Sequence, residues 1–190
     1  LFRKTFRLTG PVSRARLYIS GLGYYQASLN GGIVGDRQLD PIWTRYDKRV
    51  FYSTYDVTQQ LAEGANCLGV TLGNGWYNLL PLRMWGRRNL REHLPVGRPR
   101  FIAQLNIEYA DGSRTAVVSD TTWKWAPGPI LRNSIFLGEK YDARREVPGW
   151  DRPAFDDDAW TSVQKALEPG GMLEATPLPP VRITKHLKPV

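Results

Sequence analysis

The stretch 101–112 reads Phe101-Ile102-Ala103-Gln104-Leu105-Asn106-Ile107-Glu108-Tyr109-Ala110-Asp111-Gly112, and it decides the fold. Every second residue from Phe101 to Tyr109 is apolar, and polar residues stand between most of them. This period of two is typical of a strand with one face on a core. Asp111-Gly112 is a strong signal for a tight hairpin turn, so residues 115–118 are predicted to return as the partner strand.

Alternation of the same period recurs through the chain, and few patterns of helical period appear. It predicts strands at 2–6, 15–19, 25–29, 33–34, 50–55, 67–72, 122–125 and 130–136. Asn30-Gly31-Gly32 predicts a second hairpin, and Asp56 or Thr58 is a candidate cap for one or two short helical turns. The fold class is therefore all-β, a β-sandwich or jelly roll. A βαβ rhythm and a glycine-rich phosphate loop are both missing from the sequence, which argues against a nucleotide-binding fold.

A single domain accounts best for the 190 residues. We expect a β-sandwich domain over residues 1–176 and a proline-rich exit linker over 177–190 that leads into a further domain. The chain starts at Leu1 inside a strand pattern, so a fragment of a longer protein is expected.

The formal charge of +8 is concentrated rather than spread. Six arginines and one glutamate lie in the segment 81–100, with glycines and prolines that break regular structure: Arg83, Arg87, Arg88, Arg91, Arg98, Arg100 and Glu92. This pattern predicts one long basic loop, with only Trp85 interleaved. A nucleic-acid partner is not expected, because such surfaces repeat basic residues along a helix or alternate them with aromatic residues. A membrane partner is not expected either, because no apolar run is long enough to span a bilayer.

The run Leu72-Gly73-Asn74-Gly75-Trp76-Tyr77-Asn78 is the strongest candidate for a binding site. Glycines permit close approach of the backbone, Trp76 offers a flat apolar face, and Asn74 and Asn78 offer hydrogen-bonding carboxamides. Such a cluster suits a sugar. The same pattern also suits a structural corner at the end of a strand, and both interpretations stay open.

Catalytic motifs are weak. His93 and His186 have no metal-ligand spacing, and the buried strand around Cys67 predicts a structural thiol. Paired carboxylates remain an option, since glycoside hydrolysis needs two of them. An autonomous enzyme would use Asp40 or Asp142 together with Glu139, although each of these carboxylates also has a plainer structural explanation.

Five segments together resemble the N-terminal β-sandwich of bacterial α-L-rhamnosidases, of the galactose-binding-like jelly-roll type. They are residues 15–25, 29–31, 39–50, 55–58 and 72–77, and the later segments 134–144 and 149–160 resemble the same family. The likeness implies a non-catalytic accessory domain of an inverting enzyme that removes terminal α-L-rhamnose. The catalytic residues would lie on a separate (α/α)6 barrel further along the polypeptide.

The resemblance also implies what this module would bind. In some relatives such a module binds rhamnose through calcium, with oxygen ligands that match Asn30 and Asn78, whereas Leu29 stands where a carboxylate is expected. The candidate carbohydrate-binding residues are Asn30, Tyr52, Asn74, Trp76 and Asn78, with rhamnose-containing glycosides as ligands. A stand-alone lectin-like module is the alternative. The compartment stays open between the cytoplasm and a secreted or periplasmic location.

Overall fold

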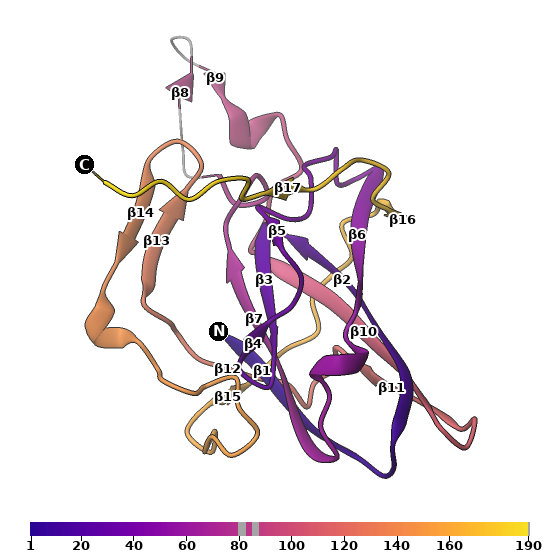
Figure 1. Cartoon of the computed structure of the whole chain (residues 1–190). Coiled ribbons are helices and arrows are strands. Elements are labelled where there is room, and N and C mark those ends of the chain that lie inside the picture. Colours follow the sequence, from indigo (N-terminus) through magenta and orange to yellow (C-terminus); the bar gives the residue numbers. More distant parts are fainter. Residues whose placement is uncertain (80–82, 85–87, 190) are drawn as a thin grey trace.

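The computed structural model describes residues 1–79, 83–84 and 88–189, and these residues form two packed main sheets that are antiparallel except for one parallel pair at an edge (Figure 1). The six-stranded sheet has the order β15-β12-β1-β7-β3-β4, and the five-stranded sheet has the order β11-β10-β2-β6-β16. The first sheet contains β15 (Thr161–Ser162), β12 (Lys124–Trp125), β1 (Phe2–Leu8), β7 (Gly64–Gly73), β3 (Tyr24–Leu29) and β4 (Gly32–Ile33). The second contains β11 (Arg114–Val118), β10 (Arg100–Tyr109), β2 (Val12–Leu22), β6 (Arg49–Asp56) and β16 (Met172–Ala175).

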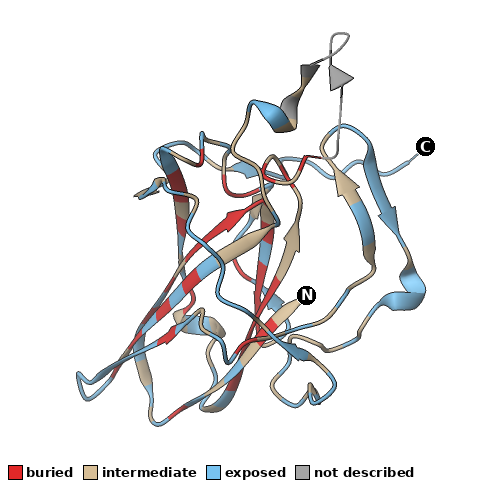
Figure 2. Cartoon of the chain, turned by 180° about the vertical axis from the view of Figure 1, so that it is seen from behind, coloured by how far each residue is buried: buried red, intermediate tan, exposed pale blue. Residues whose placement is uncertain are grey.

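The core lies between the two sheets and is built by alternation, as predicted. Ala103, Leu105 and Ile107 on β10 are almost fully buried, while the residues between them face away from the core (Figure 2). β10 lies antiparallel to β2 over its whole length, with Leu105 opposite Leu17. A matching row on β7, which includes Leu68 and Val70, closes the core from the other sheet. The all-β sandwich expected from the sequence is therefore confirmed.

Both predicted hairpins are present. Asn30 and Gly31 link β3 to β4 with φ of 55° and 85°, the left-handed conformation that an Asn-Gly turn supplies. Gly112 has φ of 82° in the turn between β10 and β11. The predicted helical turn after Asp56 is also present, as the 3-10 turn η1 (Thr58–Gln60). The carboxylate of Asp56 accepts hydrogen bonds from the backbone and the hydroxyl of Thr58 at 3.1 and 2.7 Å.

The chain after β11 wraps around the sandwich in short strands that the sequence predicts poorly. The predicted strand 130–136 is β13 (Ile130–Ser134), which pairs with β14 (Gly138–Tyr141) as a hairpin outside both main sheets. Two further 3-10 turns occur, η2 (Leu90–Glu92) and η3 (Ala143–Arg145), and none of the helices among the described residues could cross a membrane. In the exit segment, β17 (Val181–Arg182) pairs with β5 (Arg37–Gln38).

The basic segment 81–100 is described in part. β8 (Arg83–Met84) pairs with β9 (Arg88–Asn89), while Pro81, Trp85, Gly86 and Arg87 lie outside the described residues. Two of its arginines contact the body of the sandwich. The Arg91 guanidinium donates to the Asn78 side chain at 3.1 Å, and the Arg100 guanidinium lies 5.4 Å from the centre of the Tyr77 ring.

Candidate functional site

The run Leu72–Asn78 forms a tight corner at the end of β7. β7 ends at Gly73, and Gly75 has φ of 48°. A Cβ atom on Gly75 would lie 2.9–3.0 Å from backbone atoms of Gly23 and Tyr24, so the corner requires glycine there. Tyr77 then turns inward and packs edge-on against Tyr46, in a small core with Leu22 and Val50.

The two carboxamides of this corner are used inside the protein. The backbone N–H of Asn74 donates to the side-chain oxygen of Asn133 at 2.7 Å. The Asn74 side-chain Nδ2 donates to the backbone carbonyl of Asn133 at 2.8 Å. The Asn74 Oδ1 accepts from the Asn78 side chain at 2.7 Å, and the Asn78 Oδ1 accepts from Arg91. These contacts fasten the β13–β14 hairpin to the end of β7. In the structure, the side chains of Asn74 and Asn78 therefore hold a structural corner together.

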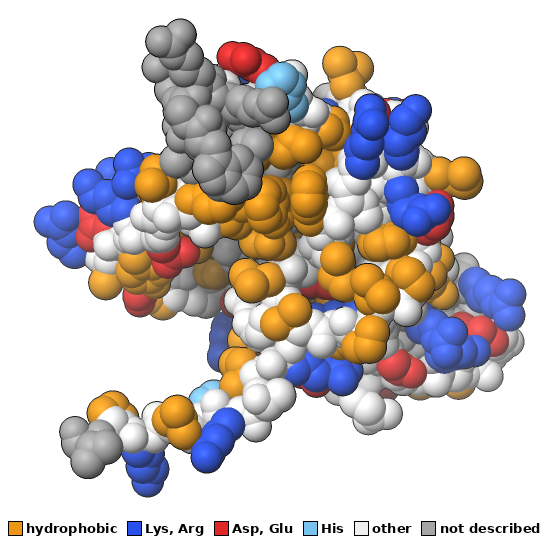
Figure 3. All heavy atoms as spheres, turned by 90° about the horizontal axis from the view of Figure 1, so that it is seen from above, with side chains coloured by type: hydrophobic (Ala, Val, Ile, Leu, Met, Phe, Trp, Pro, Cys, Tyr) orange, Lys and Arg blue, Asp and Glu red, His pale blue; other side chains and the backbone are white. Residues whose placement is uncertain are grey.

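Trp76 lies in an aromatic cluster with Trp43 and Phe136. Its ring stacks on Trp43 at 4.7 Å between centroids and meets Phe136 edge-on at 5.6 Å. Trp43 and Phe136 are each 42% exposed, so the cluster is open to solvent on one side. Figure 3 looks onto this end of the sandwich and shows hydrophobic side chains gathered there, with many of the charged ones around them.

Asn30 lies far from the corner. Its backbone and side chain bond to Cys67 at 2.9 Å, and its Nδ2 donates to the oxygens of Gln60 and Asn66 at 2.9 and 2.7 Å. Cys67 is near the start of β7, and six residues at about 3.3 Å each place the end of that strand about 20 Å away. The described residues therefore do not fit a calcium site that pairs Asn30 with Asn78. Nor do they contain any group of three or more His, Cys, Asp or Glu side chains arranged to hold a metal ion.

Tyr52 occupies a third place, on the outer face of the five-stranded sheet. Its ring meets that of Tyr18 at 6.1 Å, and both line a groove of about 410 Å³. Ile102, Val118 and Leu173 are exposed along this groove, which makes much of its surface apolar. The structure thus distributes the five predicted carbohydrate-binding residues over three separate places, and their role in binding stays a prediction.

A cavity that the sequence did not reveal lies on the outer face of the six-stranded sheet. It has a volume of about 500 Å³ between β3 and β7 on one side and the segment 128–151 on the other. Polar and aromatic groups share its lining: Gln26, Thr71, Tyr141, Glu146, Trp150 and Asp151. The Tyr141 hydroxyl donates to the Glu146 carboxylate at 2.7 Å, and this hydrogen bond raises the pKa of the Tyr141 phenol. Only contacts between distant segments create this cavity, so no local pattern could have predicted it.

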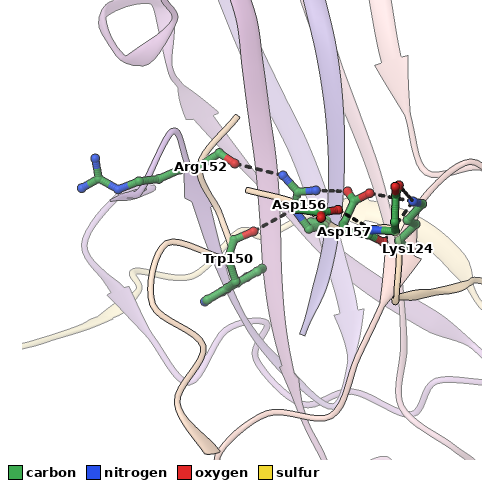
Figure 4. A network of polar contacts seen from close by, with 7 residues as sticks. Lys124, Trp150, Arg152, Asp156 and Asp157 are labelled. Carbon is green, nitrogen blue, oxygen red and sulfur yellow. Dashed lines mark hydrogen bonds and ion pairs between the residues drawn. The ribbon is translucent and has the colours of Figure 1, made fainter. Parts of the chain in front are cut away.

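The far wall of the cavity is anchored by a buried arginine. Arg3 on β1 is 1% exposed, and its Nε and Nη2 donate to the carbonyl oxygens of Trp150 and Arg152 at 2.7 and 2.9 Å. Its remaining nitrogen forms an ion pair with Asp157, which also accepts from Lys124 at 2.6 Å (Figure 4). Next to this pair the chain turns at 156–158, where the Asp156 side chain accepts a hydrogen bond from the backbone of Asp158 at 3.0 Å. No local pattern in the sequence predicts that Asp157 pairs with Arg3.

Two of the three carboxylates considered for catalysis have structural partners. Asp40 is buried, and one of its oxygens accepts from the hydroxyls of Tyr25 and Ser53 at 2.6 and 2.5 Å. Burial and this carboxylate both raise the pKa of the Tyr25 phenol. Asp142 caps η3 and pairs with Arg144 at 2.8 Å, which lowers the pKa of its carboxyl. Glu139 lies on the exposed hairpin strand β14.

Known proteins resemble this chain over nearly its whole length. The sequence profile of the family described as "Alpha-L-rhamnosidase N-terminal domain" matches residues 10–185. An α-L-rhamnosidase of Streptomyces avermitilis is 46% identical over 187 residues, which are 97% of this chain and 18% of that protein.

Solved structures agree with the sequence comparison. A crystal structure of Streptomyces avermitilis α-L-rhamnosidase complexed with L-rhamnose matches with a TM-score of 0.88 at 45% identity, covering 97% of this chain and 18% of that one. The α-L-rhamnosidase from Dictyoglumus thermophilum matches with a TM-score of 0.89 at 44% identity, covering 100% of this chain and 20% of that one. The chain therefore spans about a fifth of the length of these relatives.

Proposed function

Because the chain belongs to the family of α-L-rhamnosidase N-terminal domains, we propose that it is a non-catalytic accessory domain of an enzyme that hydrolyses terminal α-L-rhamnose from glycosides. In this proposal the domain supports a catalytic (α/α)6 domain that follows it in the same polypeptide. One observation carries the proposal: nearly the whole chain matches only 18–20% of each relative.

The carboxylate contacts favour a non-catalytic role. An inverting glycosidase holds its two carboxyl groups roughly 6.5–9.5 Å apart, with one of them poised to protonate the leaving group. Asp40 is enclosed by tyrosine and serine hydroxyls, and Asp142 is neutralised by Arg144 on an exposed turn. Asp40 is buried away from solvent, and Arg144 lowers the pKa of the Asp142 carboxyl, whereas a general acid needs a raised pKa in a substrate cleft.

Hydrolysis of 4-nitrophenyl α-L-rhamnoside tests this proposal. The chain alone is expected to release no 4-nitrophenol, while a longer polypeptide that includes the following domains releases it. Release by the chain alone that is lost in Asp142→Asn or Glu139→Gln would instead establish an autonomous enzyme.

The accessory role extends to carbohydrate binding, with rhamnosides as ligands and Asn30, Tyr52, Asn74, Trp76 and Asn78 as the residues first predicted for it. Calorimetry with L-rhamnose, with and without calcium, tests this part. Heat that saturates at millimolar sugar supports binding, and no heat in either buffer leaves a purely supporting domain. A stand-alone lectin-like module is the alternative. It would bind sugar equally well, but its gene would not continue into a helical barrel.

A further inference from the structure

We propose that the cavity between the six-stranded sheet and the segment 128–151 binds a neutral saccharide of one or two rings. This inference rests on the carbohydrate-binding part of the proposed function and assigns it a place. The volume of the cavity, about 500 Å³, lies within the range of roughly 300–1,000 Å³ that is usual for small-molecule sites.

The lining combines the two kinds of group that sugars require. Tyr141 is half exposed and provides a flat apolar face against which the C–H face of a pyranose ring can pack. Trp150, which stacks on Trp160, adds apolar lining beside it. Glu146 and Asp151 provide carboxylate acceptors, and Gln26 provides a side chain that both donates and accepts. Tyr141 and Glu146 are already oriented by their mutual hydrogen bond of 2.7 Å, which lowers the entropic cost of ordering them around a ligand.

Charge selects among saccharides. The described residues that line the cavity include two carboxylates, Glu146 and Asp151, and no lysine or arginine. A uronic acid would bring a third negative charge beside these two, and no lysine or arginine side chain among the described lining residues would balance it. A neutral sugar instead offers hydroxyl donors, which carboxylates accept strongly. The lining thus favours neutral saccharides over acidic ones.

The cavity walls are held in place by buried contacts. Arg3 fixes the backbone of Trp150 from behind, and Asn74 holds the β13 wall through Asn133. The Trp150 ring lies so close to β7 that a Cβ atom on Gly69 would be 2.8 Å from it. A site with rigid walls binds without first having to order them.

The other two places are less suited to a sugar. The carboxamides of the Leu72–Asn78 corner already bond to Asn133, to each other and to Arg91. The groove at Tyr52 is exposed along the apolar side chains of Ile102, Val118 and Leu173. Of the three places, the cavity at 128–151 brings two carboxylates, Glu146 and Asp151, together with the exposed ring of Tyr141.

Titration with methyl α-L-rhamnopyranoside, followed by calorimetry and by chemical-shift mapping, tests the proposal. Tyr141→Ala removes an aromatic face and is expected to weaken binding about tenfold, near the upper end for one aromatic contact. Tyr141→Phe keeps the ring and should stay within about threefold of the wild type. Tyr141 is 50% exposed, so the substitution spares the core. Tyr52→Ala and Trp76→Ala test the two competing places that the sequence predicted, and a sugar bound in the cavity leaves the affinity of both variants at the wild-type level.

Three results would overturn the proposal. If Tyr52→Ala or Trp76→Ala weakens binding and Tyr141→Ala does not, the sugar binds elsewhere, and carbohydrate binding stands without this site. If D-galacturonate binds as tightly as the neutral rhamnoside, the selection by charge is wrong. If no saccharide binds, this site and carbohydrate binding both fall, while the accessory role is judged separately by the hydrolysis experiment.

Discussion

Replacement of Arg3 by methionine is expected to release the segment that wraps over the six-stranded sheet. Arg3 is 1% exposed and bonds to two backbone carbonyls, those of Trp150 and Arg152, as well as to the Asp157 carboxylate. Methionine can fill much of the apolar part of this space but offers no donor. The two carbonyls and the carboxylate then lose their charged partner.

The expected loss of stability is about 3–4 kcal/mol. Hydrogen bonds that involve a charged group contribute about 1.5–3 kcal/mol each, and removal of one partner of a buried ion pair costs about 3–5 kcal/mol. Lys124 remains 2.6 Å from Asp157 and keeps that carboxylate partly neutralised, which places the loss in the lower part of this range. With a urea m-value of about 2 kcal/mol per M, the unfolding midpoint falls by about 1.5–2 M.

Equilibrium urea unfolding, followed by tryptophan fluorescence and by circular dichroism, measures this shift. Arg7→Met is the matched control, because Arg7 lies on the same strand and is exposed, so its replacement should change the free energy of unfolding by less than about 0.5 kcal/mol. If Arg3→Met costs less than about 1 kcal/mol, the buried guanidinium does not anchor the segment, and the reasoning is refuted.

Further predictions concern titration, reactivity and backbone strain. The pKa of Asp120 is lowered to about 2, and the hydrogen bond from Lys4 is the largest cause. The ionised Asp120 carboxylate therefore stabilises the folded protein fully above pH 3.8, and this stabilisation is lost as the pH falls toward 2. Lys4→Met should move this pKa part of the way back to 3.8 in a carboxyl NMR titration, and an unchanged pKa would contradict the assignment. Cys67 is 0% exposed and burial raises the pKa of its thiol, so Ellman's reagent should react only with urea-unfolded protein, and rapid labelling of the native protein would refute this. Gly23 has φ of 112°, and a Cβ atom there would lie 2.1 Å from a backbone oxygen, so Gly23→Ala should cost more than about 3 kcal/mol. Gly112→Ala is the control, because Gly112 has φ of 82° but nothing lies within 4 Å of the added Cβ atom. It should lower the free energy of unfolding by only about 1–2 kcal/mol in the same experiment. Equal losses in the two variants would show that the close contact at Gly23 is unimportant.

The strands of the two main sheets were largely predictable because their signals are local. β10 and β11 are joined by an Asp-Gly turn and alternate clearly, and β3 and β4 are joined by Asn-Gly. In each case the residues that determine the hairpin are neighbours in the sequence, so the pattern contains most of the information.

The late strands and the cavity were not predictable in this way. β14 and β16 are each four residues long, and most of their residues are exposed on both faces. Their sequences therefore do not alternate between apolar and polar residues in the way that predicts a strand. Arg3 appears in the sequence as one polar residue in a strand, and its burial depends on a carbonyl 147 positions away. The carboxamides of Asn74 and Asn78 fit both a sugar site and a corner in sequence, and only their partners in space distinguish the two.

The parallel pairing of β16 with β6 protects the protein against self-association. β6 is eight residues long, and without β16 it would be the outermost strand of its sheet, with a row of free backbone donors and acceptors. Long uncovered edges of this kind template the addition of further strands from other molecules. β16 covers the first half of that edge, Arg49–Tyr52, with a strand of four residues, to which the ion pair between Arg49 and Glu174 adds charge. A polypeptide that ends before Met172 lacks β16 and would therefore aggregate more readily, even though its hydrophobic core stays complete.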